Sequence, residues 1–88
     1  MKTIFSREIN DWTVFVDRLS RREIEEFELT DDDRDGSTQS EGVADRVRVL
    51  LRQKSAIYAV FAVWPDGDDT FLQSVHSSPA AAIRAAKR

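Results

Sequence analysis

Trp12-Thr13-Val14-Phe15-Val16 is the stretch on which the assignment of the first third of this chain depends. Its residues are aromatic or β-branched, which is typical of a strand. The apolar residues in and around it also recur at a helical spacing of i, i+3, i+7 and i+10, as Ile9, Trp12, Val16 and Leu19. Because this stripe extends beyond the run on both sides, we predict a helix here and keep a strand over 12–16 as the alternative.

A second helix is predicted over residues 20–29, directly after the first. Ser20 and Glu23 have the spacing of a capping box, in which each side chain bonds the backbone N–H of the other residue. Ile24 and Phe27 would then form the buried edge of a short helix. After a polar segment, Ser40 can cap a third helix that runs to about residue 54.

The last third of the sequence predicts a β-hairpin and a final helix. Residues 57–64 and 70–75 are rich in strand-forming side chains, and Pro65-Asp66-Gly67 between them is a turn sequence. Ser78 followed by Pro79 is a typical helix start, with a capping hydroxyl and then proline at the first helical position. The alanines that follow would let this helix approach the sheet closely.

These elements predict a small single α+β domain over residues 1–88, with an acidic flexible loop at residues 31–40. The expected order is α-α-α-β-β-α, with the helices packed on a β-hairpin. If residues 12–16 form a strand instead, the hairpin becomes a three-stranded antiparallel sheet. The apolar share of 41% is enough for one compact core.

Charge is distributed very unevenly along the chain. Residues 23–41 contain nine acidic residues and one base, Arg34, so this window carries −8 while the whole chain carries −3. The remaining residues therefore sum to +5. Within the window, Asp31, Asp33 and Asp35 alternate and are followed by Gly36, a spacing that can wrap oxygen ligands around a hard cation.

On this point the stretch resembles the loop of an EF-hand calcium motif. With Asp31 at loop position 1, Asp33 and Asp35 take positions 3 and 5, and Gly36 takes the glycine position. The resemblance implies calcium as a ligand, with Asp31, Asp33 and Asp35 coordinating it. Position 12 is Gly42 where the family has a bidentate glutamate, so the motif is degenerate.

The alternative use of the acidic window is contact with another protein. The predicted helix over 20–29 has arginines in its first turn and glutamates in its last, which is the reverse of what the helix dipole favours. A segment charged against its own dipole is a candidate for recognition of a basic surface. The candidate partner-binding residues are Glu25, Glu26, Glu28, Asp31, Asp32, Asp33, Asp35 and Glu41.

We therefore expect a non-enzymatic, acidic protein-binding module whose partner is a larger protein with a basic surface. In size and charge alone the chain resembles small inhibitors that block nucleic-acid-binding proteins, such as phage-encoded anti-defence proteins. A pI near 5.1 argues against direct nucleic-acid binding. The basic residues outside the window would also permit weak self-association with the acidic segment of a second copy.

Few residues are available for catalysis. The chain has no cysteine and one histidine, His76, which we expect at the rim of the sheet, bonded to a hydroxyl or the backbone. We accordingly expect no enzymatic activity and, apart from the calcium alternative, no cofactor. The lack of cysteine fits a reducing compartment, and no apolar run has the length of a signal peptide or membrane span, so we expect a cytoplasmic protein without membrane contact.

Overall fold

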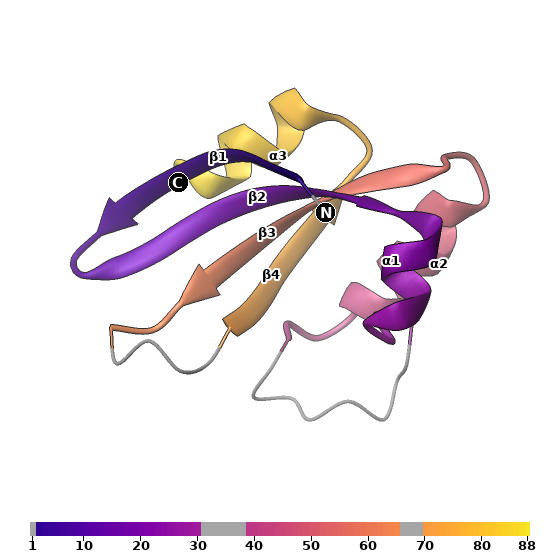
Figure 1. Cartoon of the computed structure of the whole chain (residues 1–88), viewed down its shortest axis with the longest axis horizontal. Coiled ribbons are helices and arrows are strands. Elements are labelled where there is room, and N and C mark those ends of the chain that lie inside the picture. Colours follow the sequence, from indigo (N-terminus) through magenta and orange to yellow (C-terminus); the bar gives the residue numbers. More distant parts are fainter. Residues whose placement is uncertain (1, 31–38, 66–69) are drawn as a thin grey trace.

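The computed structural model describes residues 2–30, 39–65 and 70–88 (Figure 1). Its seven elements follow one another in the order β-β-α-α-β-β-α. They are β1 (Lys2–Ile9), β2 (Trp12–Ser20), α1 (Arg21–Glu26), α2 (Val43–Leu51), β3 (Ala56–Val63), β4 (Thr70–His76) and α3 (Pro79–Ala86).

The predicted order α-α-α-β-β-α is wrong, because residues 2–20 form a β-hairpin, whereas the stripe from Ile9 to Leu19 predicted a helix. Asn10 and Asp11 join the two strands in a two-residue turn, with φ of 49° and 71°. Two consecutive positive φ values match the twist of antiparallel strands, and Asn and Asp tolerate them better than most residues. The alternative of a strand over 12–16 is the one that the structure has, but the sheet has four strands and not three.

The helical stripe in this region is misleading because β2 is covered on both faces. Val14 and Val16 lie in the core on the side of α3, whereas Leu19 lies in the core on the side of α1 and α2. A strand buried on both faces has no alternation of apolar and polar residues. Its apolar residues can therefore fall at helical spacing by coincidence.

The sheet is an antiparallel meander in the order β1-β2-β3-β4, so β2 and β3 are central and β1 and β4 are the edges. Asp17 on β2 is the one charged side chain that is buried among the described residues, with 2% exposed. Thr3 on β1 donates its hydroxyl proton to Asp17 Oδ1 at 2.5 Å. This bond supplies the carboxylate with a donor and holds the start of β1 against β2.

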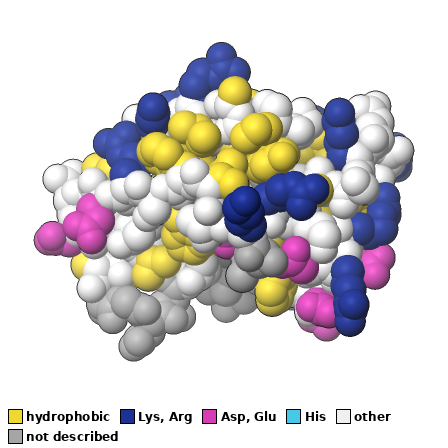
Figure 2. Space-filling model, turned by 45° about the horizontal axis from the view of Figure 1, so that its top comes forward, with side chains coloured by type: hydrophobic (Ala, Val, Ile, Leu, Met, Phe, Trp, Pro, Cys, Tyr) yellow, Lys and Arg dark blue, Asp and Glu magenta, His cyan; other side chains and the backbone are white. Residues whose placement is uncertain are grey.

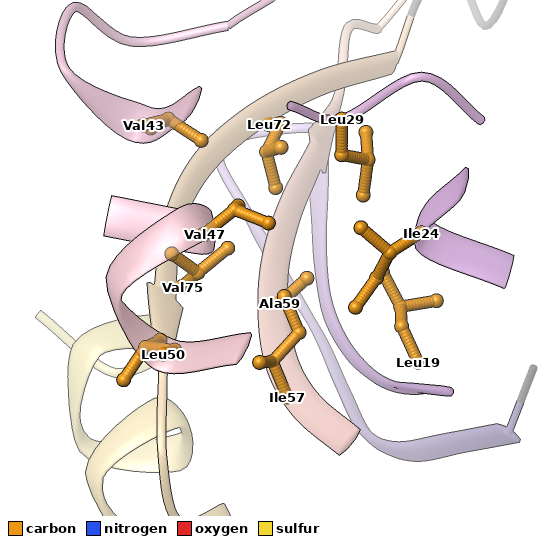
Figure 3. Packing of buried hydrophobic residues seen from close by; sticks show 10 residues of the cluster. All are labelled: Leu19, Ile24, Leu29, Val43, Val47, Leu50, Ile57, Ala59, Leu72 and Val75. Carbon is orange, nitrogen blue, oxygen red and sulfur yellow. The ribbon is translucent and has the colours of Figure 1, made fainter. Parts of the chain in front are cut away.

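The helices cover the sheet from both sides. α1 and α2 pack on one face, and Figure 3 shows ten buried side chains of this layer pointing toward one another. They are Leu19, Ile24, Leu29, Val43, Val47, Leu50, Ile57, Ala59, Leu72 and Val75. α3 packs on the other face, against a second cluster that contains Val14, Val16, Val60, Ala62, Ala82 and Ala86.

The two strands and the final helix predicted for the last third of the chain are confirmed, whereas Asp66 and Gly67 of the predicted turn lie outside the described residues. Ser78 is the N-cap of α3 and its side chain accepts a hydrogen bond from Ala81 N at 3.2 Å, with proline in the first turn. Ala82 and Ala86 are buried, so the small side chains do allow close packing on the sheet. None of the helices in the described ranges combines the length and the apolar character needed to span a membrane.

Candidate protein-binding surface

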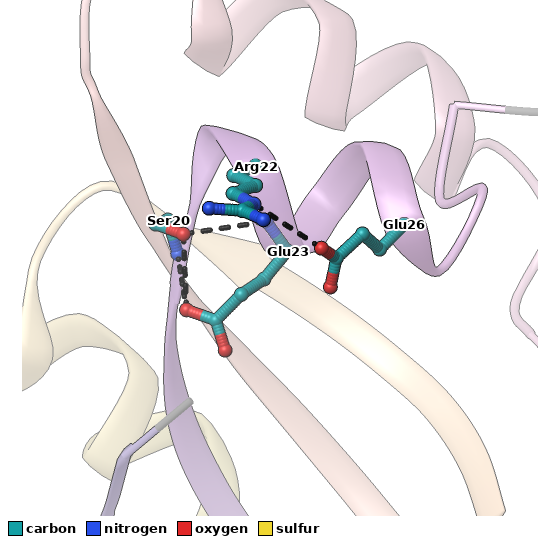
Figure 4. Close-up of polar contacts among 4 residues, drawn as sticks. All are labelled: Ser20, Arg22, Glu23 and Glu26. Atoms are coloured by element: carbon teal, nitrogen blue, oxygen red, sulfur yellow. Dashed lines mark hydrogen bonds and ion pairs between the residues drawn. The ribbon is translucent and has the colours of Figure 1, made fainter.

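The candidate surface lies where α1 ends and α2 begins. The start of α1 is as predicted: Ser20 and Glu23 form a capping box, with Ser20 N donating to Glu23 Oε1 at 3.1 Å and Glu23 N donating to Ser20 Oγ at 3.3 Å (Figure 4). Leu19 and Ile24, on either side of this cap, are completely buried. Because the start of α1 is capped and its neighbours are buried, the exposed end of the helix is held in a defined place.

α1 ends after Glu26, in a backbone arrangement that usually contains glycine. Leu29 N donates to Ile24 O at 3.1 Å, and Glu28 N donates to Glu25 O at 3.2 Å. These two bonds define a Schellman motif, and the buried pair Ile24 and Leu29 supplies its hydrophobic contact. The residue with the left-handed backbone is Glu28, at φ 55°.

The prediction that Phe27 is buried is wrong. Phe27 is the C-cap of α1 and 44% of it is exposed. Glu25, Glu26 and Glu28 around it are exposed as well. The end of α1 therefore presents one aromatic ring among three carboxylates.

Two arginines in the first turn of α1 bond in different directions. Arg22 reaches along the helix to Glu26, with Nε 3.3 Å from Oε1 (Figure 4). Arg21 donates instead to the backbone oxygen of Leu51, at the end of α2. The ion pair between Arg22 and Glu26 is exposed and adds little stability, since such pairs contribute about 0.3–0.5 kcal/mol.

The beginning of α2 completes the surface. Ser40 is not the N-cap that we predicted: α2 begins after Gly42, at φ 81°, and Ser40 N donates to Leu72 O of β4 at 3.0 Å. Glu41 is exposed just before this turn. Arg48 of α2 donates to Thr30 O and to Asp45 Oδ1, so α2 is tied directly to the chain that leaves α1.

Four of the eight predicted partner-binding residues are thus placed and are exposed: Glu25 and Glu26 end α1, Glu28 follows it, and Glu41 precedes α2. The other four, Asp31, Asp32, Asp33 and Asp35, lie outside the described residues, as does the predicted calcium loop. The described part of the chain holds no cluster of three or more potential metal ligands. The calcium hypothesis stays a prediction.

His76 agrees with its prediction. It lies half-buried at the end of β4, and its Nε2 is 2.9 Å from Ser74 Oγ. Burial lowers the pKa of His76 below its usual value, and the positive charges of Arg46 and Arg88 lower it further. A partly buried histidine bonded to a hydroxyl is explained by its place in the fold.

Two features of the surface were beyond sequence reasoning. Phe27 falls at the position of a buried residue in a helical pattern, and only the end of α1 at Glu26 turns it outward. The left-handed backbone of Glu28 could not be predicted from the sequence, because this conformation after a helix is usually found at glycine or asparagine. Neither a family model, nor a curated protein, nor a solved structure matches this chain.

Proposed function

We propose that this chain is a non-enzymatic protein-binding module whose acidic end contacts a basic surface on a larger protein. The described residues of this acidic end are Glu25, Glu26, Glu28 and Glu41, and the exposed Phe27 lies between Glu26 and Glu28 in the sequence. An exposed aromatic ring with charged residues around it has the composition of an interface core and its rim.

The left-handed backbone of Glu28 carries the proposal. The left-handed conformation costs a residue with a Cβ about 1 kcal/mol or more of conformational free energy, whereas it costs glycine nothing. Glu28 also puts a negative charge at the negative end of the helix dipole, as do Glu25 and Glu26, which adds roughly 0.3–1 kcal/mol per exposed charge. Both the backbone conformation and the helix dipole make glutamate unfavourable at position 28. Its presence there is explained if the negative charge is needed for binding.

The basic surface that suits such an end is the kind that binds nucleic acid, since phosphate contacts require clustered lysine and arginine. A module that covers this surface competes with the nucleic acid and acts as an inhibitor. The sequence has no cysteine, which fits action in the cytoplasm.

The test is a triple charge reversal, Glu25→Lys, Glu26→Lys and Glu28→Lys. Lysine at the end of a helix is favoured by the dipole, so the variant should be at least as stable as the parent and any loss of binding is not a loss of fold. The immobilised parent should retain basic proteins from the cells it comes from and release them at high salt. The triple variant should retain none of them.

A single charge reversal at the acidic end, Glu28→Lys, is compared with a control reversal elsewhere, Glu8→Lys. Both residues are exposed acids, but Glu8 lies on β1 and is remote in sequence from the acidic end. We expect Glu28→Lys to weaken capture and Glu8→Lys to leave it unchanged. Retention of the same proteins by the triple variant would refute the proposal.

A further inference from the structure

The outer edge of β1 is a second candidate surface, separate from the acidic end. β1 pairs with β2 and with no other described strand, so the backbone groups on its outer side have no strand partner. The opposite edge of the sheet differs, because Gln39 forms a parallel bridge with Leu72 of β4 and Ser40 N donates to the oxygen of the same residue. Figure 1 shows β1 at the rim of the molecule.

The hairpin register identifies the backbone groups that face outward. Ile9 and Trp12 flank the two-residue turn, so they exchange both backbone hydrogen bonds. Bonding alternates along an antiparallel strand, so Arg7 also points its backbone groups toward β2, while Ser6 and Glu8 point theirs outward. The register shifts between Thr3 and Phe5, and this irregularity limits the regular open stretch to residues 5–9.

The face of this edge on the α3 side carries basic side chains beside the apolar Phe5 and Ile9. Arg7 donates from Nη1 to Lys87 O at 3.1 Å, and Lys87 Nζ lies 5.6 Å from the centre of the Phe5 ring. Lys2, at the start of the strand, pairs with exposed Arg18. Figure 2 views the molecule with the top of Figure 1 turned forward; hydrophobic side chains gather near the centre, with lysine and arginine above and beside them and acidic side chains toward the left and lower right.

The other face of the edge differs in charge. Glu8 pairs with Thr13, and Ser6 pairs with Phe15. Phe15 stacks on Phe61 of the layer that α1 and α2 cover, so these side chains lie away from α3. A strand added to β1 would therefore meet positive charge on the α3 side and a neutral or negative surface on the opposite side.

The charges on the two faces decide which kind of strand can pair with the outer edge of β1. If two copies paired symmetrically through β1, the α3 faces would be continuous and the basic side chains of both copies would lie side by side, which is unfavourable. An extended segment with acidic side chains at alternate positions would place every carboxylate on the basic face. We propose that β1 binds such a segment of another protein, added to the sheet as a fifth strand through backbone hydrogen bonds.

The experiment uses the full chain and synthetic nine-residue peptides. The probe alternates glutamate with threonine and valine. One control peptide has lysine in place of every glutamate, and a second keeps the glutamates but has proline at two central positions, which prevents it from pairing as a strand. We expect only the first to bind, with shifts of the backbone amide signals of residues 5–9 in proton–nitrogen NMR spectra and binding that weakens as salt is raised.

Two variants test the backbone and the charges separately. Ser6→Pro removes an outward N–H, and proline is tolerated on an edge strand, so the fold should persist while the probe binds about tenfold more weakly. Ser6→Ala keeps that N–H and should bind as the parent does. The double variant Lys2→Glu with Arg7→Glu should reverse the peptide preference of the chain, so that it binds the lysine peptide and not the glutamate peptide.

Any of four results would overturn the proposal. They are equal binding by Ser6→Pro, shifts confined to residues away from β1, no binding of the probe at millimolar concentration, and self-association of the parent that Ser6→Pro abolishes. The last would assign the edge to a second copy. None of these depends on the acidic end, so the two proposals fail independently.

Discussion

At the end of α1, Glu28 has its backbone at φ 55° and its side chain in solvent, so backbone and charge can be separated by substitution. Glu28→Gly relieves the left-handed conformation and should raise the free energy of unfolding by about 0.5–1 kcal/mol, or the melting temperature by roughly 2–8 °C. Thermal unfolding followed by circular dichroism measures this. If the proposed function is correct, the same variant should also bind basic proteins more weakly.

Glu28→Ala is the control for this prediction. It removes the charge and keeps a Cβ in the left-handed region, so it should show the part of the gain that comes from the charge and lack the part that comes from the backbone. If both variants melt at the same raised temperature, charge and not backbone strain limits stability at this residue.

Local interactions at single residues were predictable, whereas exposure was not. The capping box of Ser20 and Glu23 and the cap of Ser78 involve neighbours three residues apart, so the sequence contains all of the chemistry. Phe27 follows the same helical periodicity as Ile24, yet Ile24 is buried and Phe27 is exposed. Which of them is covered depends on where the helix ends and what packs over it.

Among the elements, α3 depends most directly on the size of its side chains. Ala82 has no exposed surface and faces the sheet, whereas Ala80 in the same turn is exposed. Ala82→Leu should push the helix from the sheet and lower the free energy of unfolding by about 1–3 kcal/mol. Ala80→Leu should change it by less than about 0.5 kcal/mol.

Chemical denaturation of both variants makes the comparison. The two substitutions add the same atoms to the same helix, so helix propensity cancels and the difference reports close packing alone. Equal stability of the two variants would show that α3 has room to move away from β2, β3 and β4 at no cost.

The element that was predicted wrongly is the N-terminal hairpin. Asn10-Asp11 is a weaker turn signal than Asn-Gly, and β2 is buried on both faces, which hides the alternation of a strand. The second hairpin has Pro65-Asp66-Gly67 between its strands, and there the prediction is confirmed. Two causes therefore combine at the N-terminal hairpin: its turn sequence is weaker, and the apolar residues of β2 fall at helical spacing.

At the scale of the whole molecule, His76 links stability to pH. Burial and the charges of Arg46 and Arg88 lower its pKa in the folded chain below the value of 6.5 in the unfolded chain. The unfolded chain therefore binds the proton more readily, so the contribution of His76 to stability is fully present above 6.5 and is lost as pH falls through 6.5 toward the folded value.

Urea unfolding from about pH 8 to about pH 5.5 tests this prediction, because carboxylates titrate mostly below that range. The parent should lose stability as pH falls, and His76→Gln, which cannot gain the charge, should lose less. Parallel pH profiles of the two proteins would contradict the assigned cause. Arg46 belongs to α2 and Arg88 follows α3. The pH dependence of the unfolding free energy therefore depends on charges from the helical layers on both sides of the sheet.

The sequence alone determined those features whose chemistry lies within a few residues: the helix caps at Ser20 and Ser78, the second hairpin, the small-residue face of α3 and the acidic window at residues 23–41. Tertiary structure decided the rest. Residues 12–16 are a strand because they pair with both β1 and β3, and Phe27 is exposed because α1 ends at Glu26. Burial is a property of the whole fold, and apolar spacing reveals it only where one face of an element meets water.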